Sequence, residues 1–227
     1  MEKQRLKELS SRYEKLYSGV IYDSLIFDLK YDKPFVVSHR IKNRTHRGTY
    51  FGRAFTCAGA KVPELSLLDD TVRIKMFNDF YDGCIQVIDT GTDRTVAHFG
   101  DISGKLARKF GAKCAVIDGY TRDADILSGD EYSVFCRNTT PIDAFERWQI
   151  VDYQCDIKLP AMNGGEIKVT PSDFLFCDGD GVLVIESDIV MDVLNLAEDR
   201  NARENMVRKE ILNTNDIQEL YNRIGRW

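Results

Sequence analysis

Proline and glycine are scarce in this sequence, and long apolar runs are missing. The 227 residues include 5 prolines and 16 glycines, which is too few for a collagen-like chain and argues against a disordered one. No run approaches the roughly 18 apolar residues that a membrane-spanning helix needs. Residues 1–17 are charged throughout and lack the apolar core of a secretory signal. We therefore expect a globular, cytoplasmic protein without membrane contact.

Paired cysteine motifs are also absent. The 6 cysteines are scattered, and no two form a CxxC or zinc-ribbon pattern. Most lie in apolar segments such as CAVID and VFCRN, which is typical of buried thiols in a reducing compartment. His39, His46 and His98 are too widely spaced to form a recognisable metal motif. The sequence CDGDG begins like a calcium loop but lacks the later ligands, which favours a turn between strands.

The charge balance is acidic, with a formal net charge of -5. The most basic stretch, residues 39–53, is interrupted by uncharged side chains, whereas duplex binding needs a contiguous basic stripe. We therefore expect no nucleic-acid partner, although a local basic loop could bind a small anion or a subunit. No GxGxG-type turn follows an early strand, which argues against a methyltransferase.

The hydrophobic pattern predicts a single domain over residues 1–227 with helices at both ends. Apolar side chains at helical spacing indicate an N-terminal helix over about residues 1–18 and a helical tail over about residues 187–227. The chain alternates strand, helix and strand from Val72 and becomes strand-rich after Val134. This order is typical of an α/β fold with a small parallel sheet and crossover helices.

Two buried strands and the helix between them form the most informative region. Cys84–Asp89 and Cys114–Ile117 are predicted strands, and Phe99–Phe110 has apolar residues at helical spacing. We expect the second strand to end in a turn at Asp118 and Gly119. The other predicted strands are Phe35–Val37, Arg53–Ala58, Val134–Arg137, Gln149–Asp156, Glu166–Thr170, Phe174–Cys177 and Val182–Ile185.

Polar residues follow these strands at places where a ligand could bind. Gly100–Ser103 begins the predicted helix, so its backbone N–H groups and the helix dipole would stabilise a carboxylate. Arg122 offers a planar fork for a carboxylate or a 2-oxo group, and Asp123 can hold a divalent cation that keeps several waters. An adjacent Arg and Asp can also be exposed residues that form surface salt bridges and have no role in binding. Because ligands bind at the carboxyl ends of parallel strands, we expect a shared, enolate-stabilising pocket.

Several segments of the sequence match the pattern of one known family. The block GDISGKLARKFGAKCAVIDGYTRD has a Gly-led helix start followed by a VIDG-x-x-RD motif, and in this it resembles the RraA-like family, which includes the HMG/CHA aldolases. VFCRNTTPIDAFERW and GGEIKVTPSDFLFCDGDGVLVI resemble the segments that follow, so the similarity spans roughly residues 50–190. It implies a swivelling-type α/β/β domain that forms a homotrimer or hexamer. It also implies a lyase that uses Mg²⁺ or Mn²⁺ to cleave 4-hydroxy-4-methyl-2-oxoglutarate or a related acid, or to decarboxylate oxaloacetate.

The resemblance assigns roles to the motif residues. The residues that would bind the pyruvyl half of the substrate are Gly100, Asp101, Ile102, Ser103 and Arg122. Asp101 would also orient a water that serves as proton donor or base, Arg122 would hold the substrate oxygens, and Asp123 would hold the metal. The family adds a carboxylate from the C-terminal helix of a neighbouring subunit, for which Glu198 is the candidate and Glu204 the rival.

The chain also departs from the family pattern. Many members have an acid where this chain has Ile126, and a Gly-rich loop where it has Thr90-Gly91-Thr92. We expect both changes to line the pocket and to alter the substrate rather than the pyruvyl-binding core. Two alternatives stay open: a non-catalytic protein that binds and regulates a ribonuclease, and a lyase or dehydratase for sugar acids. The retained Asp101, Arg122 and Asp123 favour an enzyme.

Overall fold

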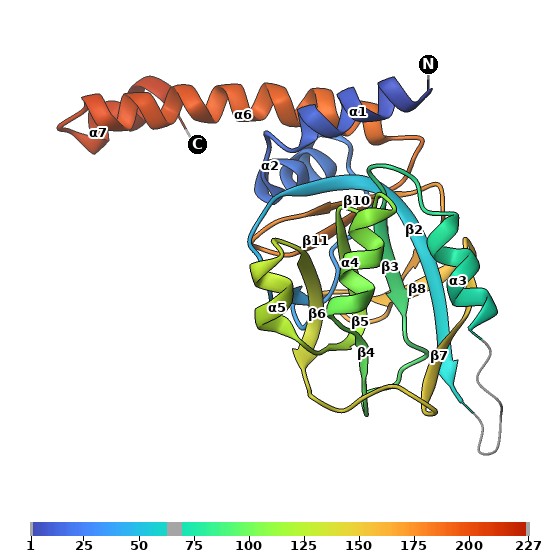
Figure 1. The fold of residues 1–227 in the computed structure, drawn as a ribbon. Helices are drawn as coiled ribbons and strands as arrows, with labels where there is room; N and C mark the ends of the chain where they lie inside the picture. Colours follow the sequence, from blue (N-terminus) through green and yellow to red (C-terminus); the bar gives the residue numbers. More distant parts are fainter. Residues whose placement is uncertain (1, 63–69, 226–227) are drawn as a thin grey trace.

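The computed structural model describes residues 2–62 and 70–225 (Figure 1). No helix within these two ranges is both long and apolar enough to cross a membrane. The predicted terminal helices were expected to reach residues 1 and 226–227, which lie outside the described residues.

Three short helical segments open the chain and pack beneath its C-terminal helix. The first of them ends at Tyr13, which is fully buried, rather than near residue 18. The Tyr13 ring stacks on Phe51 with centroids 3.8 Å apart, and its hydroxyl donates to the Val190 carbonyl at 2.6 Å. The segments are α1 (Glu2–Tyr13), α2 (Ser18–Asp23) and the π-helical η1 (Ser24–Asp28).

Four parallel strands form the centre of the fold, which confirms the predicted α/β class. They lie in the order β6-β5-β3-β2, and α3, α4 and α5 lie on one face of the sheet (Figure 1). Helices link the strands because parallel neighbours must start at the same edge. The elements are β2 (Tyr50–Lys61), α3 (Thr71–Asn78), β3 (Ile85–Asp89), α4 (Asp101–Lys109), β5 (Cys114–Thr121), α5 (Ala124–Gly129) and β6 (Ser133–Thr139).

Further strands extend this sheet and make the second half of the chain strand-rich, as predicted. β10 pairs antiparallel with β2 and β11, β7 pairs with the other end of β2, and β4 runs parallel to the end of β5. The sequence pattern predicts neither β4 nor β8. These strands are β1 (Lys42–Asn43), β4 (Ala97–Phe99), β7 (Trp148–Tyr153), β8 (Ile157–Pro160), β9 (Glu166–Val169), β10 (Phe174–Cys177) and β11 (Val182–Ile185).

The chain continues into α6 (Val190–Asn213) and α7 (Ile217–Ile224). The first half of α6 packs on α2 and η1, and its second half extends from the body with α7 folded back along it (Figure 1). We call residues 201–224 the C-terminal arm. Its exposed apolar side chains include Leu212, at 84% exposure, and Ile217, at 72%.

Three clusters of buried apolar side chains join the layers. The first lies between the parallel sheet and α3, α4 and α5, and includes Met76 and Ile117. The second covers the opposite face of the sheet beneath β8 and β9. The third packs β10 and β11 against the N-terminal helices and α6. Each apolar face is therefore buried against a further layer.

Two of the sequence expectations are wrong in detail. Asp118 and Gly119, expected to form a turn, lie inside β5. The strand tolerates the buried Asp118 carboxylate because Arg94 and Arg137 both form ion pairs with it. Phe35–Val37 forms two isolated bridges rather than a strand, since Val36 and Val37 pair with different segments.

The cysteines are free thiols, and all except the half-buried Cys155 are buried, as expected. Burial raises the pKa of Cys84 and of Cys136 to about 12. Thiolate is therefore scarce at neutral pH, which argues against either one as a nucleophile.

A buried histidine joins β4 to the end of β5. His98 Nδ1 accepts a hydrogen bond from the Tyr120 backbone N–H at 3.1 Å, and Nε2 lies 3.1 Å from an Asp93 carboxylate oxygen. A backbone N–H can only donate, so the neutral ring with its proton on Nε2 satisfies both bonds. Gly119 is required because a Cβ there would clash with the His98 ring. Burial lowers the pKa of His98, although the charge of Asp93 opposes this shift.

We predict that His98 makes stability depend on pH. Its contribution is fully present above its ordinary pKa of about 6.5 and is lost as the pH falls below that value, because the unfolded chain binds the proton more readily. Replacing His98 by Asn leaves the buried Asp93 short of a donor, which costs about 1–3 kcal/mol near pH 8. In urea unfolding, the free energies of unfolding of wild type and His98→Asn should differ less near pH 5.5 than near pH 8.

The matched control is His39→Asn, since His39 is exposed. This variant should have the wild-type free energy of unfolding at both pH values. The prediction would be contradicted if the free energies of wild type and His98→Asn differed by the same amount at both pH values.

Candidate active site

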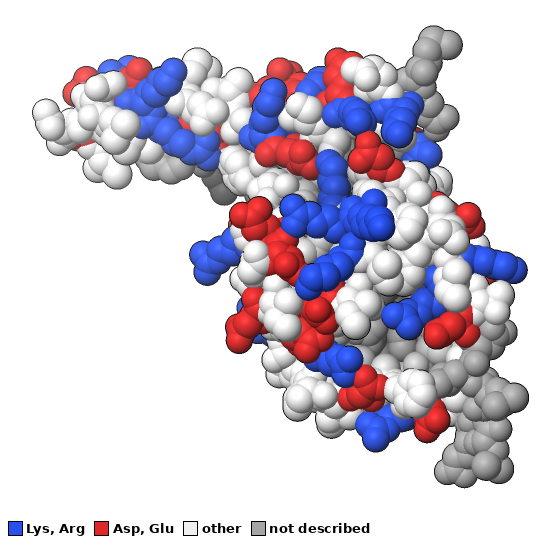
Figure 2. All heavy atoms as spheres, in the orientation of Figure 1, with Lys and Arg blue, Asp and Glu red and all other residues white. Residues whose placement is uncertain are grey.

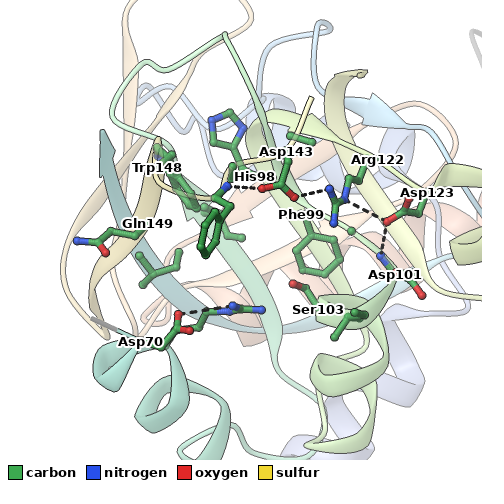
Figure 3. Close-up of a pocket in the computed structure, with 18 of the residues that line it drawn as sticks. Asp70, His98, Phe99, Asp101, Ser103, Arg122, Asp123, Asp143, Trp148 and Gln149 are labelled. Carbon is green, nitrogen blue, oxygen red and sulfur yellow. Dashed lines mark hydrogen bonds and ion pairs between the residues drawn. The ribbon is translucent and has the colours of Figure 1, made fainter. Parts of the chain in front are cut away.

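The ends of β4 and β5 open into a pocket of about 250 Å³. Its walls come from α3, the start of α4, β3, β7 and the loop between β6 and β7. Figure 3 shows the labelled side chains around this pocket. The predicted site residues that line it are Gly100, Asp101, Ile102, Ser103, Arg122 and Asp123.

The helix α4 presents its N-terminus to the pocket. Gly100 is the N-cap residue in an extended conformation, and the helix starts at Asp101. The first N–H groups of a helix have no partner inside it, so this end favours an anion. The Ile102 side chain is 64% exposed, which limits its expected part in binding to its backbone.

The carboxylate of Asp123 lies at this helix end. Its Oδ2 accepts the Asp101 backbone N–H at 3.3 Å and lies 3.4 Å from Arg122 Nε (Figure 3). Asp123 has a left-handed backbone with φ 58°, a conformation that aspartate tolerates better than most residues. A Cβ at Gly100 would lie 2.8 Å from Asp123 Oδ2. Glycine at that position therefore makes the close approach of the carboxylate possible.

Arg122 lies between two carboxylates. Its backbone N–H donates to the Phe99 carbonyl at 2.9 Å, which fixes the residue beside the start of α4. Its guanidinium pairs with Asp143 through Nη1 and with Asp123 through Nε. Asp143 is itself held by the backbone N–H of Phe145. A guanidinium has five N–H donors, so Arg122 can bind substrate oxygens while these ion pairs orient it.

Asp101 stands at the side of the pocket and is held in its ionised form. Its Oδ2 lies 3.1 Å from the ammonium of Lys105, and this contact lowers the pKa of Asp101. An ionised carboxylate only accepts hydrogen bonds. Asp101 is thus better suited to orient a water or to take up a proton than to act as an acid.

Asp123 is the pocket carboxylate that the sequence assigns to a hard divalent cation. Among the described residues, no group of three or more His, Cys, Asp or Glu is placed to hold a metal. Magnesium tolerates such a sparse donor set, because it keeps several waters and uses one or two protein carboxylates with substrate oxygens. The residues therefore fit Mg²⁺ or Mn²⁺ held by Asp123, water and substrate.

The far end of the pocket is mainly apolar and aromatic. Trp148 forms part of this wall. Its Nε1 donates to the Thr90 carbonyl at 3.0 Å, and its ring lies nearly perpendicular to the His98 ring, with the centroids 4.7 Å apart. Arg73 of α3 and Gln86 of β3 bring polar groups to the same end.

Two predicted carboxylates lie outside the pocket of their own chain. Arg12 holds Glu198 through Nε at 2.9 Å and Nη2 at 2.6 Å, which joins α1 to α6. Glu204 accepts hydrogen bonds from Arg208 and Tyr17. Their donation to a neighbouring subunit stays a prediction.

The two departures from the family pattern also lie elsewhere, contrary to expectation. Thr90 is fully buried behind the wall, where its hydroxyl donates to the Asp118 carbonyl at 2.6 Å. Ile126 is 51% exposed on α5 and does not line the pocket. Neither position therefore contacts a ligand bound in the pocket of its own chain.

Sequence reasoning missed Asp143 and the far wall. Asp143 follows β6, the neighbour of β5, so the strand-end argument that selected Arg122 could also have found it. No sequence pattern marked the far-wall residues Arg73, Gln86 and Trp148. Only the packed structure shows which sides of α3, β3 and β7 face one another.

Comparisons with known proteins agree on the family. The sequence model of the RraA-like family, described as Aldolase/RraA, matches residues 21–184. A Halalkalibacterium halodurans protein named "Putative 4-hydroxy-4-methyl-2-oxoglutarate aldolase" is 29% identical over 157 residues, which cover 67% of this chain and 72% of that protein.

Solved structures share the fold. One, described as belonging to "novel cellulases from microbes associated with the gut ecosystem", has 27% identity and a TM-score of 0.77 over 88% of this chain and 86% of its own. The RraAS2 protein of Streptomyces coelicolor, described as an unusual member of the RNase ES inhibitor RraA family, has 19% identity and a TM-score of 0.71, with 88% and 96% covered.

The family match contains the parallel sheet and every residue from Gly100 to Asp123. It also spans the loop that carries Asp143 and the wall formed by α3 and β7. Because it covers most of the chain and the structural neighbours have the same fold, the chain belongs to the RraA-like family.

Proposed function

We propose that this protein is a divalent-metal-dependent carbon–carbon lyase for pyruvate-type 2-oxo acids, such as 4-hydroxy-4-methyl-2-oxoglutarate or oxaloacetate. The observation that carries the proposal is the meeting of Arg122, Asp123 and the N-terminus of α4 in one pocket. The name of the Halalkalibacterium relative supports the same reaction class.

The 2-oxo acid half of the substrate matches the groups around α4. Its carboxylate would accept hydrogen bonds from the backbone of Gly100–Ser103, where the helix end favours negative charge. The guanidinium of Arg122 would bind the remaining oxygens of this half in a fixed orientation, because Asp143 and Asp123 hold it from two sides.

Breaking the bond beyond C3 leaves an electron pair on the pyruvyl half. Asp123 would hold a Mg²⁺ or Mn²⁺ ion, which when bound supplies a Lewis acid for the 2-oxo group. Arg122 would add its positive charge at the same oxygens, where negative charge develops. Asp101, kept ionised by Lys105, would orient the water that exchanges a proton with the substrate. Such a group typically contributes about 10²- to 10⁴-fold to the rate.

Turnover should depend on a divalent metal. We expect EDTA to abolish pyruvate release from 4-hydroxy-4-methyl-2-oxoglutarate or oxaloacetate, and magnesium or manganese to restore it, since Asp123 alone cannot polarise the 2-oxo group. A coupled lactate dehydrogenase assay measures the release. Free metal ions also decarboxylate oxaloacetate, so the rate without protein is subtracted. Activity that survives complete chelation would rule out the metal mechanism.

Substitution of the central pair should separate catalysis from folding. We predict that Asp123→Ala abolishes turnover and that Arg122→Lys lowers kcat/KM about tenfold to more than a hundredfold. Lysine cannot reproduce two parallel hydrogen bonds, and a charge-assisted bond contributes about 1.5–3 kcal/mol. Asp125→Ala and Arg108→Lys are matched controls, since both residues lie outside this pocket.

The controls should retain wild-type kcat/KM, and all four variants should keep the wild-type circular dichroism spectrum. Wild-type activity in both central variants would refute the proposed roles. If no 2-oxo acid is turned over while the protein binds and inhibits a ribonuclease, the regulator alternative replaces the enzyme.

We also infer that the chain assembles through its C-terminal arm. Met206, Leu212 and Ile217 are 60%, 84% and 72% exposed, which is unfavourable for a projecting helix that stays alone in water. The RraA-like resemblance points to a trimer or a multiple of it, and closed symmetry would bury these side chains equally in every subunit.

Sedimentation equilibrium should therefore give three or a multiple of three chains at micromolar concentration. Combining Leu212→Glu with Ile217→Glu should lower the mass, because the new charges would be buried without partners. Asn205→Glu introduces a charge at an exposed polar position of α6 and should leave the mass unchanged. A wild-type monomer would contradict this prediction.

A further inference from the structure

The end of the pocket opposite Arg122 has polar groups that the reaction described above does not use. Figure 3 shows Arg122 and Asp123 on one side of the pocket and Asp70, the N-cap residue of α3, on the other. Arg73, one turn after Asp70, and Gln86 line this second side. An acid with only three carbons has no group to place there.

Arg73 is a cation with a weak partner. Of the described residues that line the pocket, only Arg73 and Arg122 carry a positive charge. The ion pair of Arg73 with Asp70 spans 3.6 Å, and the Asp70 side chain is 67% exposed, a type of pair that contributes little. Phe77 lies beneath the guanidinium at 6.0 Å and supports it. Arg73 is therefore placed to exchange Asp70 for an anionic group of a ligand.

Gln86 is a polar side chain buried without adequate partners. It is 2% exposed on the central strand β3. Its Nε2 lies 3.9 Å from Cys57 Sγ and 3.8 Å from Met76 Sδ, and its Oε1 has no hydrogen-bond partner among the described residues. Exchanging the two ends of the amide would still leave one of them facing only sulfur. Such a group destabilises the fold. A ligand hydroxyl would give the amide oxygen the partner it lacks once the side chain turns this buried atom toward the pocket that the residue lines.

We infer that Arg73 and Gln86 select the leaving half of the substrate, an inference that rests on the lyase function proposed above. The matching substrate is a 4-hydroxy-2-oxo acid with a second carboxylate. The carboxylate pairs with Arg73, and Gln86 turns its amide oxygen toward the pocket, where the 4-hydroxyl group donates to it. During cleavage the C3–C4 bond breaks, the hydroxyl proton passes to water, C4 becomes a carbonyl carbon, and C3 takes up a proton. No external oxidant or reductant is required.

The first experiment compares two substrates that differ in one charge: 4-hydroxy-4-methyl-2-oxoglutarate and 4-hydroxy-4-methyl-2-oxopentanoate, in which a methyl group replaces the second carboxylate. Arg73→Met should lower kcat/KM for the diacid about tenfold to a hundredfold and change the value for the monoacid less than about twofold. Lys75→Met removes the same charge from an exposed position of α3 and should change neither value. Equal losses on both substrates, or none, would overturn the assignment of Arg73.

The second experiment tests the hydroxyl contact of Gln86. Gln86→Met replaces the amide with an apolar side chain of similar length, so the thermal unfolding midpoint should stay the same or rise. The variant should lose about tenfold in kcat/KM on both 4-hydroxy substrates and keep its rate of oxaloacetate decarboxylation, because oxaloacetate has no 4-hydroxyl group. A fall in the unfolding midpoint with equal losses on all three substrates would show that Gln86 is structural.

The third experiment does not depend on turnover. Calorimetry with magnesium present compares 2-oxoglutarate, which has two carboxylates, with pyruvate, which has only one. Arg73→Met should weaken 2-oxoglutarate binding about tenfold or more and leave pyruvate binding unchanged. If no 2-oxo acid is turned over, the lyase proposal fails, and this difference still decides whether Arg73 binds a second carboxylate. Identical effects on both ligands would refute the subsite.

Discussion

The end of β5 has to reach the start of α4, and the rest of the site depends on that contact. Two backbone N–H groups make it: Arg122 donates to the Phe99 carbonyl at 2.9 Å, and Asp101 donates to the Asp123 carboxylate at 3.3 Å. Glycine at position 100 and the left-handed turn at Asp123 leave room for it. The same few atoms thereby orient a guanidinium, the carboxylate of Asp123 and a helix N-terminus.

The sheet supplies the rigid base for this contact. Because β3, β5 and β6 are parallel neighbours, their ends lie at one edge, and the loop after β6 brings Asp143 to the guanidinium of Arg122. The buried His98 and the buried Asp118 bind the end of β5 to the elements beside it. Figure 2 shows acidic and basic side chains intermixed on one face of the molecule, so local pairs rather than a broad field of one sign set the electrostatics of that face.

The sequence was sufficient to predict the class of fold and one half of the pocket, because that half is encoded by contiguous segments. Apolar spacing predicts α4, and the buried run from Cys114 predicts the core of β5. The Asp-Gly pair at 118–119 predicts a turn but lies in a strand. Two arginines pair with the Asp118 carboxylate, and the His98 ring packs against Gly119, so tertiary contacts outweigh the local turn preference. Arg73 and Gln86 could not be predicted, because their relation to Arg122 arises only when α3 and β3 pack.

The contacts between α1 and α6 also constrain the order of events during synthesis. Arg12 binds Glu198 across 186 residues of sequence, and Tyr13 reaches Val190 across 177. Until α6 leaves the ribosome, Tyr13 has no carbonyl to receive its hydroxyl hydrogen bond, and the apolar face of α1 lacks one of its covering layers. The residues that line the pocket are all translated before α6. The buried contacts of the N-terminal helix with α6 therefore form only after the last part of the chain has been translated.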